Sequence, residues 1–212
     1  CIRDSYNTGY ADDDDRKSGP YHDSNSDGSI DFKSEYNVGW AVTAAKRDVC
    51  SACDTNYDFT KTIFDAYLEG RTLITNQADI SAILAQRDVV MNNWEKVVAA
   101  VSVHYVNDTV EEIARLIDAG DASLSPGTSA TADYEKYWGE MRGYANGLIY
   151  NDFKLIDDAS LARILQVMGT NPVYPSNGNF DAMQAYHNSL VNEVRQIFAQ
   201  EYGFSQANVA GW

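Results

Sequence analysis

The sequence predicts an all-α protein: a bundle of about six or seven helices, preceded by an irregular acidic arm. Apolar residues recur every three or four positions over most of residues 36–212, which is typical of amphipathic helices. No segment combines alternating apolar residues with a hairpin turn, so strands are not expected. We therefore predict an arm with a calcium-binding loop over residues 1–35 and a helical bundle domain over residues 36–212.

The composition indicates a folded protein with a strong negative charge. The 212 residues are 44% hydrophobic, which is enough for a sizeable core. The 31 acidic residues outnumber the 16 basic ones, which gives a net charge of −15. Nucleic acid is not an expected partner, because binding to phosphates needs clustered lysine and arginine. No apolar run reaches the ~18 residues that a membrane-spanning helix needs.

Residues 36–50 and 58–74 are predicted to form the first two helices. Valine and alanine recur at helical spacing in the first. In the second, Asp58 or Thr60 is available to cap the N-terminus. The second helix carries an apolar stripe that consists of Phe59, Ile63, Phe64, Tyr67 and Leu68.

A long core helix is predicted to start near residue 79, and it either continues or restarts after Asp108. Thr109 followed by Glu112 has the spacing of a capping box, which favours a restart. Gly120 is a suitable C-terminal stop. The apolar residues that predict this helix are Ile80, Ile83, Leu84, Val90, Met91, Trp94, Val97, Val98, Val101 and Tyr105.

Three more helices are predicted in the C-terminal half. An aromatic helix covers residues 132–151, a short helix covers 157–169 and the last covers 180–203. A polar loop precedes the first of them, and a turn with two prolines separates the second from the third.

The segment HDSNSDGSIDFKSEY, residues 22–36, resembles the loop of a calcium site. Asp23, Asn25 and Asp27 occupy the first, third and fifth positions of such a loop, and Gly28 provides the sharp turn. Alternate spacing directs their hard oxygen atoms into one cavity, as calcium requires.

The rest of this calcium loop departs from the standard pattern at its end. Ser29 offers a backbone carbonyl group and Asp31 holds the ninth position. The twelfth position, where a bidentate glutamate belongs, is Ser34, and Glu35 follows one residue later. We predict Ca²⁺ bound by Asp23, Asn25, Asp27, Ser29, Asp31 and Glu35; the alternative is a solvated acidic turn.

A second metal site is suggested by His104, Asp108 and Glu111. Residues four and three apart share one face of a helix, and imidazole with carboxylates suits a transition metal such as iron. The alternative is a half-buried histidine whose ring bonds to a neighbouring carboxylate or carbonyl group.

The cysteines have several possible roles, since a pair spaced as Cys50 and Cys53 can be a redox pair, half of a zinc site or, as favoured in an exported protein, a local disulfide. Cys50 and Cys53 are separated by two residues, and we predict a local disulfide, since the second pair of a four-cysteine zinc site is absent. Cys1 is the first residue, as in a mature bacterial lipoprotein with an acylated cysteine; the alternative is a processing boundary.

Four segments resemble a family of exported bacterial domains of unknown function, distantly similar to the imelysin-like proteins. They are DAYLEGRTLI, NNWEKVVAAVSVHYVND, YEKYWGEMRGYANGLIYN and the ending MGTNPVYP…YGFSQANVAGW, so the resemblance covers residues 36–212. The resemblance implies an all-helical lipoprotein, longer at its N-terminus in other members, with an upstream companion segment. Imelysin-like proteins are linked to iron uptake, and their hallmark is a G-x-H-x-x-E motif. Here His104 is kept, while Ser102 replaces the glycine and Asn107 the glutamate.

The sequence therefore predicts an exported protein of the bacterial periplasm, outer membrane or cell surface that binds a ligand. No hydrolase, metalloprotease, P-loop or dinucleotide motif occurs in it. The leading hypothesis is a calcium-stabilised binding protein related to metal uptake. The alternative is a structural or adhesive homo-oligomer whose arm is ordered by calcium.

Overall fold

The computed structural model describes residues 28–29, 39–48 and 50–212. Helices cover 71% of the chain, and the described ranges contain no strand, so the predicted all-α fold is confirmed. The chain divides into two compact units, Cys1–Val97 and Val98–Trp212. The boundary falls inside the longest helix and within the segment that we predicted to be one bundle domain.

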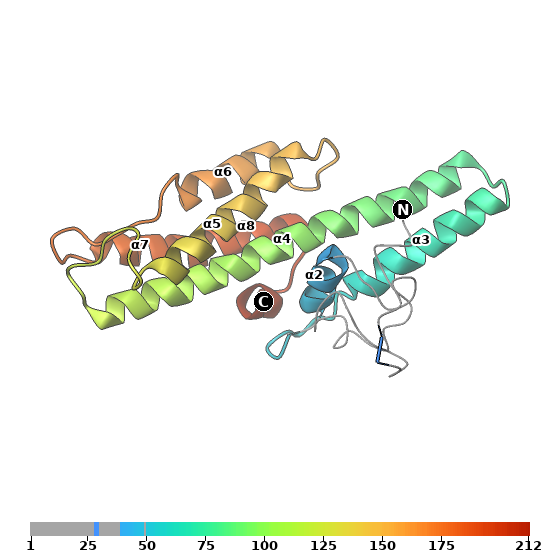
Figure 1. Cartoon of the computed structure of the whole chain (residues 1–212). Helices are drawn as coiled ribbons and strands as arrows, with labels where there is room; N and C mark the ends of the chain where they lie inside the picture. The colour runs from blue at the N-terminus through green and yellow to red at the C-terminus, as the bar shows by residue number, and fades with distance from the viewer. Residues whose placement is uncertain (1–27, 30–38, 49) are drawn as a thin grey trace. The chain divides into compact units, whose positions relative to one another are not determined.

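Unit 1 contains a helical hairpin and a short helix. Its elements are α2 (Gly39–Asp48), α3 (Phe59–Thr75) and the first part of α4 (Ile80–Ala119) (Figure 1). Phe59 and Ile63 of α3 are buried together with three alanines of α2. The indole of Trp94 donates a hydrogen bond of 3.4 Å to the hydroxyl of Tyr67, which joins α4 to α3.

The N-terminus of α3 is capped by a residue from another helix. Asp58 precedes the helix with a φ of 48°, and its side chain makes no capping hydrogen bond. The backbone N–H of Thr60 donates instead to both carboxylate oxygens of Asp48, each at 3.3 Å. Asp58 holds the predicted N-cap position, but neither its side chain nor that of Thr60 provides the cap, because the fully buried Asp48 of α2 accepts this hydrogen bond instead.

Helix α4 runs through Asp108 without a break and has 40 residues. The predicted capping box was wrong. Thr109 is fully buried, and its hydroxyl donates a hydrogen bond of 2.6 Å to the carbonyl of Tyr105. Glu112 accepts two hydrogen bonds from Arg115. The predicted stop is confirmed, since α4 ends before Gly120, which has a φ of 62°.

Two parts of the predicted apolar stripes are outside the core. Leu68 is 58% exposed and Ile80 is 67% exposed, although both were expected to face inward. Leu68 lies in the second half of α3 and Ile80 begins α4, on the side of the α3–α4 connection, and Figure 1 shows that this end of the hairpin extends away from α2. Helical periodicity is therefore correct there, but α2 does not cover that part of the hairpin.

Unit 2 contains the rest of α4 and the C-terminal helices. Residues 181–202 form one continuous helix whose middle turn is a π-helix. The elements are α5 (Ala132–Gly147), η1 (Leu148–Tyr150), α6 (Asp158–Met168), α7 (Asp181–Ser189), η2 (Leu190–Val194), α8 (Arg195–Tyr202) and α9 (Gln206–Gly211).

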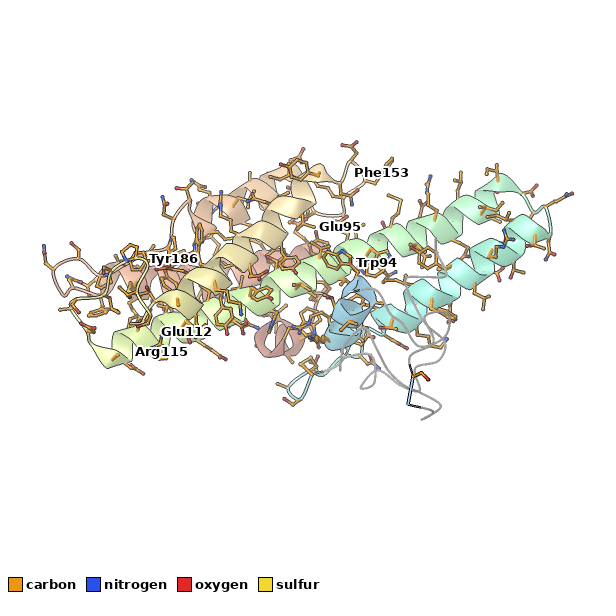
Figure 2. The ribbon with its side chains drawn as sticks, viewed as in Figure 1. Trp94, Glu95, Glu112, Arg115, Phe153 and Tyr186 are labelled. Atoms are coloured by element: carbon orange, nitrogen blue, oxygen red, sulfur yellow. A yellow bond between two sulfur atoms is a disulfide. The ribbon has the colours of Figure 1, made fainter. Side chains whose placement is uncertain are left out.

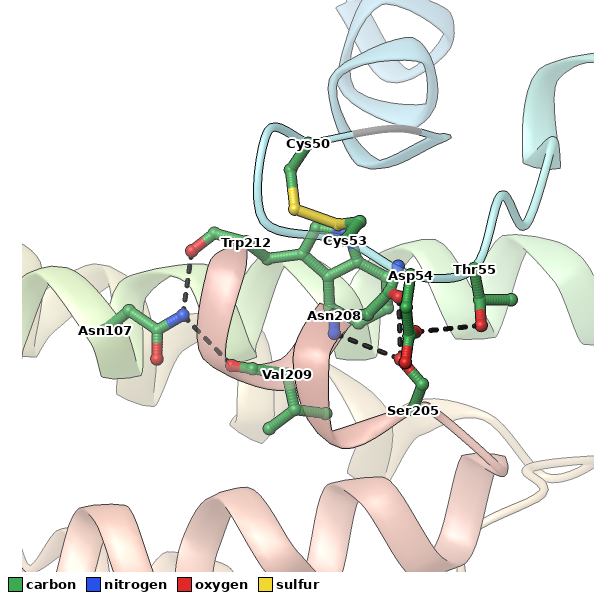
Figure 3. Close-up of a disulfide and its surroundings, with 9 residues drawn as sticks. All are labelled: Cys50, Cys53, Asp54, Thr55, Asn107, Ser205, Asn208, Val209 and Trp212. Atoms are coloured by element: carbon green, nitrogen blue, oxygen red, sulfur yellow. Dashed lines mark hydrogen bonds between the residues drawn. A yellow bond between two sulfur atoms is a disulfide. The ribbon is translucent and has the colours of Figure 1, made fainter.

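Buried polar side chains of α4 hold other helices of unit 2 in place. The hydroxyl of Ser102 donates a hydrogen bond of 3.2 Å to the carbonyl of Met141 on α5. The amide of Asn107 donates to the carbonyl groups of Val209 and Trp212, at 3.1 and 2.8 Å (Figure 3). These bonds satisfy carbonyls that the end of α9 would leave without helical partners.

A disulfide joins Cys50 to Cys53 just after α2 (Figure 3). The backbone N–H of Cys53 also donates a hydrogen bond of 3.1 Å to the carbonyl of Cys50. The bridge is the one predicted from the two-residue spacing, and it closes a single turn. Within the described ranges, no helix has the length and apolar character to cross a membrane.

Candidate functional site

His104 and Asp108 form a side-chain pair on α4. The Nε2 atom of His104 lies 3.5 Å from Oδ2 of Asp108, one helical turn away. The His104 side chain is 30% exposed and that of Asp108 is 25% exposed. Both groups are held by the helix and remain reachable from solvent, so the pair can offer a nitrogen and an oxygen ligand to a metal ion.

Half-buried tyrosines flank this pair. The ring of Tyr105 lies 5.0 Å from the His104 imidazole and stacks on Tyr144 of α5 at 5.6 Å. Tyr137 adds a third ring, 6.2 Å from Tyr105. Burial raises the pKa of Tyr144, and the nearby Glu140 raises it further. Tyr144 is therefore neutral at physiological pH, and the stacked rings pack against the part of α4 that carries His104.

Glu111, the third predicted ligand, faces a different neighbour. It is exposed, and its charge acts on Arg195 of α8, where it opposes the lowering of the Arg195 pKa by burial. Among the described residues, no three His, Cys, Asp or Glu side chains are grouped closely enough to hold a metal ion. The structure thus pairs two of the three predicted ligands, and metal binding there stays a prediction.

The calcium loop lies almost wholly outside the described residues. Of its members only Gly28 and Ser29 are described. Gly28 has a φ of 85°, a left-handed conformation that favours glycine, and Ser29 is exposed. The ligands Asp23, Asn25, Asp27, Asp31 and Glu35 are not among the described residues, so calcium binding stays a prediction.

Three aromatic residues of unit 2 form an interior cluster: Tyr134, Trp138 and Tyr186. The hydroxyl of Tyr186 donates a hydrogen bond of 2.8 Å to the carbonyl of Met168. The Trp138 indole donates to the same carbonyl and to the Tyr186 hydroxyl, at 3.2 and 3.0 Å. The cluster thus satisfies the C-terminal end of α6.

Tyr134 fixes the proline-containing loop that follows α6. Its hydroxyl donates to the carbonyl of Val173 at 3.0 Å and accepts from the N–H of the same residue at 2.9 Å. Burial raises the pKa of Tyr134 to about 12. The phenol therefore stays protonated over the physiological range and keeps both hydrogen bonds.

A carboxylate next to Tyr134 ties two loops to α5. One oxygen of Glu135 accepts hydrogen bonds from the N–H of Gly127 at 2.8 Å, the hydroxyl of Thr131 at 2.8 Å and the hydroxyl of Tyr174 at 2.7 Å. The N–H of Gly127 contributes most to lowering the pKa of Glu135, followed by the Tyr174 and Thr131 hydroxyls. This arrangement is structural, since all three donors belong to neighbouring loops.

The sequence analysis missed a second surface, which consists of the end of η1 and the turn that leads to α6. We call residues 149–155 the aromatic turn. Tyr150 is 85% exposed and Phe153 is 70% exposed, and Figure 2 shows Phe153 projecting from the end of the α5–α6 connection. The useful signal was an aromatic residue on either side of Asn151–Asp152, two polar residues that favour a turn.

Hydrogen bonds hold the backbone of the aromatic turn. The side-chain oxygen of Asn151 accepts a hydrogen bond of 3.0 Å from the N–H of Phe153. The backbone carbonyl of Asn151 accepts another, of 3.2 Å, from the N–H of Lys154. Lys154 forms an ion pair of 2.8 Å with Asp158. The exposed rings are therefore presented by an ordered segment.

Comparisons of the chain with protein-family models, curated proteins and solved structures found no match.

Proposed function

We propose that this chain is an exported, calcium-stabilised helical binding protein of the bacterial periplasm or cell surface that takes part in metal uptake. The observation that carries the proposal is the His104–Asp108 pair, with its Nε2 and Oδ2 atoms 3.5 Å apart and both side chains partly exposed. Iron or a chemically similar divalent ion would bind these two atoms and complete its coordination with water or a carried ligand.

Export is supported by the disulfide between Cys50 and Cys53. Disulfides persist in oxidising compartments such as the periplasm and the cell exterior. The acidic surface agrees with such a location, because a net charge of −15 is screened in a salty, cation-rich medium.

Isothermal titration calorimetry with Fe²⁺ under anaerobic conditions, and with Zn²⁺, tests the metal proposal. Both titrations are done in excess Ca²⁺ so that the predicted calcium loop is occupied. We expect His104→Ala to abolish binding. The matched control is His187→Ala, since His187 is also partly exposed and its ring lies 3.3 Å from the side chain of Asn188. Equal heats from the wild type and His104→Ala would contradict the proposal.

The calcium part of the proposal has its own test. Titration with Ca²⁺ should give heat with the wild type and none with Asp27→Ala, because Asp27 holds the fifth loop position. His104→Ala serves as the control and should bind Ca²⁺ as the wild type does. Unchanged Ca²⁺ binding by Asp27→Ala would contradict the calcium loop.

A self-assembling surface subunit is the second candidate. The observation in its favour is the exposed apolar surface of the α3–α4 hairpin, to which Leu68, Ile74 and Ile80 contribute, each at least half exposed. Sedimentation velocity with Ca²⁺ and with EDTA separates the candidates. Calcium-dependent oligomers that Leu68→Ser with Ile80→Ser dissolves would favour assembly, and a monomer in both buffers would rule it out.

A further inference from the structure

We propose that the aromatic turn is a docking site for a basic amphipathic helix of a partner protein. The inference goes beyond metal binding and uses none of the proposed metal ligands. Its first support is the exposure of two large rings, Tyr150 at 85% and Phe153 at 70%. Ile149, which is 49% exposed, extends the same apolar surface.

The ordered backbone beneath the rings reduces the conformational entropy that is lost when a partner binds. Two hydrogen bonds to Asn151 order the backbone between them. Aromatic side chains have few rotatable bonds, so little conformational entropy is lost when they are covered. Exposed aromatic residues on an ordered segment are typical of the residues that dominate binding energy at protein interfaces.

The charges around the turn favour a positively charged partner. Residues 149–158 contain three aspartates and one lysine, a net charge of −2. That lysine, Lys154, is already paired with Asp158. Glu201 adds a further carboxylate, which accepts a hydrogen bond of 2.8 Å from Ser160 at the start of α6.

An apolar surface on a segment with a net negative charge fits a partner whose apolar residues are flanked by lysine or arginine. A cationic side chain can also lie over the exposed ring of Tyr150 or Phe153 and gain a cation–π interaction. A second copy of this chain fits poorly, because two chains with a charge of −15 each repel one another. An anionic membrane is disfavoured for the same reason.

A model peptide tests the proposal on the full chain. The probe is a fluorescein-labelled amphipathic helix made only of leucine and lysine, and binding is followed by fluorescence anisotropy. A peptide with glutamate in place of every lysine is the charge control. We expect the lysine peptide to bind and the glutamate peptide to bind at least tenfold more weakly, roughly the cost of like charges at an interface.

Site-directed variants then locate the binding. Tyr150→Ser combined with Phe153→Ser should weaken binding of the lysine peptide by about tenfold or more. The matched control, Leu68→Ser combined with Ile74→Ser, removes two exposed apolar side chains of unit 1 and should change the Kd less than about twofold. Asp152→Lys should weaken binding without removing either ring. Circular dichroism checks that each variant keeps its helix content.

Three outcomes would overturn the proposal. One is the same Kd for the wild type and the Tyr150→Ser, Phe153→Ser variant. Another is an equal loss of binding in the Leu68→Ser, Ile74→Ser control. The third is concentration-dependent dimerisation of the wild type that is lost in the Tyr150→Ser, Phe153→Ser variant, which would make a second copy the occupant. Failure here leaves the Fe²⁺ titration of His104 unaffected, so the two proposals fail separately.

Discussion

The interior cluster and the aromatic turn use the same kinds of side chain in opposite ways. In the interior cluster, the polar atoms of Tyr134, Trp138 and Tyr186 all bond to other groups of unit 2. In the aromatic turn, Tyr150 and Phe153 lie mostly in solvent. The interior rings hold helix and loop ends together, whereas the rings of the turn leave most of their apolar area exposed to solvent. Figure 2 shows both regions, with Tyr186 among the helices and Phe153 at the tip of the connection.

We expect the largest loss of stability when Tyr186 is replaced. Tyr186→Ala removes a buried ring and leaves the carbonyl of Met168 with one hydrogen bond fewer. We expect the free energy of unfolding to fall by about 3–5 kcal/mol, as measured by urea denaturation followed by circular dichroism. Tyr150→Ala is the matched control from the turn and should change it by no more than about 0.5 kcal/mol. Similar losses in both variants would break the comparison.

Tyr134→Phe tests the interior cluster through a single oxygen atom. The variant leaves both backbone groups of Val173 without this partner, and we expect a loss of about 1–3 kcal/mol at neutral pH.

The pH dependence gives a second readout for Tyr134. Its pKa rises from 10.0 to about 12 on folding, so the fold favours the protonated phenol. The resulting stability is fully present below the ordinary pKa of tyrosine and is lost as the pH rises through the folded value. Urea denaturation at a series of alkaline pH values should show a shallower decline for Tyr134→Phe than for the wild type. Parallel declines would contradict the role of the buried hydroxyl.

Glu135 should contribute to acid sensitivity at the loops beside the interior cluster. Its pKa is lowered in the fold, chiefly by the N–H of Gly127. The stability from this carboxylate is therefore present above the unfolded pKa and is lost as the pH falls through the folded one. We expect Glu135→Gln to be less stable at neutral pH and to have a flatter acid limb in thermal unfolding. Glu69→Gln, at an exposed position of α3, is the control and should follow the wild type.

A smaller change in stability, this time a gain, is expected from a substitution at an exposed position of α5. Gly143 lies within the helix, and among the described residues an added Cβ would meet no atom within 4 Å apart from the backbone of its own helix. Gly143→Ala should raise the free energy of unfolding by about 0.5–1 kcal/mol, because glycine is a poor helix former. Thermal unfolding by calorimetry measures the change. A destabilised variant would indicate that this face of α5 is covered.

Helical periodicity was sufficient to predict most helices, but it could not identify hydrogen-bond partners that lie far apart in the sequence. The cap of α3 comes from Asp48, twelve positions before the N–H that it accepts from, and no local pattern indicates that residue. The capping box at Thr109 and Glu112 failed because the fully or mostly buried Val106, Val110 and Ile113 favour an unbroken helix through it.

The candidate sites were predictable to different degrees. His104 and Asp108 are four residues apart on a helix, so their proximity follows from helical geometry alone. The aromatic turn could not be found this way, because sequence does not distinguish a tyrosine that a neighbouring helix covers from one that is left exposed. That distinction depends on tertiary packing.

Hydrogen exchange of the full chain, with and without the leucine–lysine peptide, tests the claim that the interior aromatic residues build the fold and that the turn binds a partner. We predict that the peptide slows exchange at residues 149–158 and leaves Tyr134–Met141 unchanged. Slowing spread evenly over both regions, or confined to another helix, would contradict the claim.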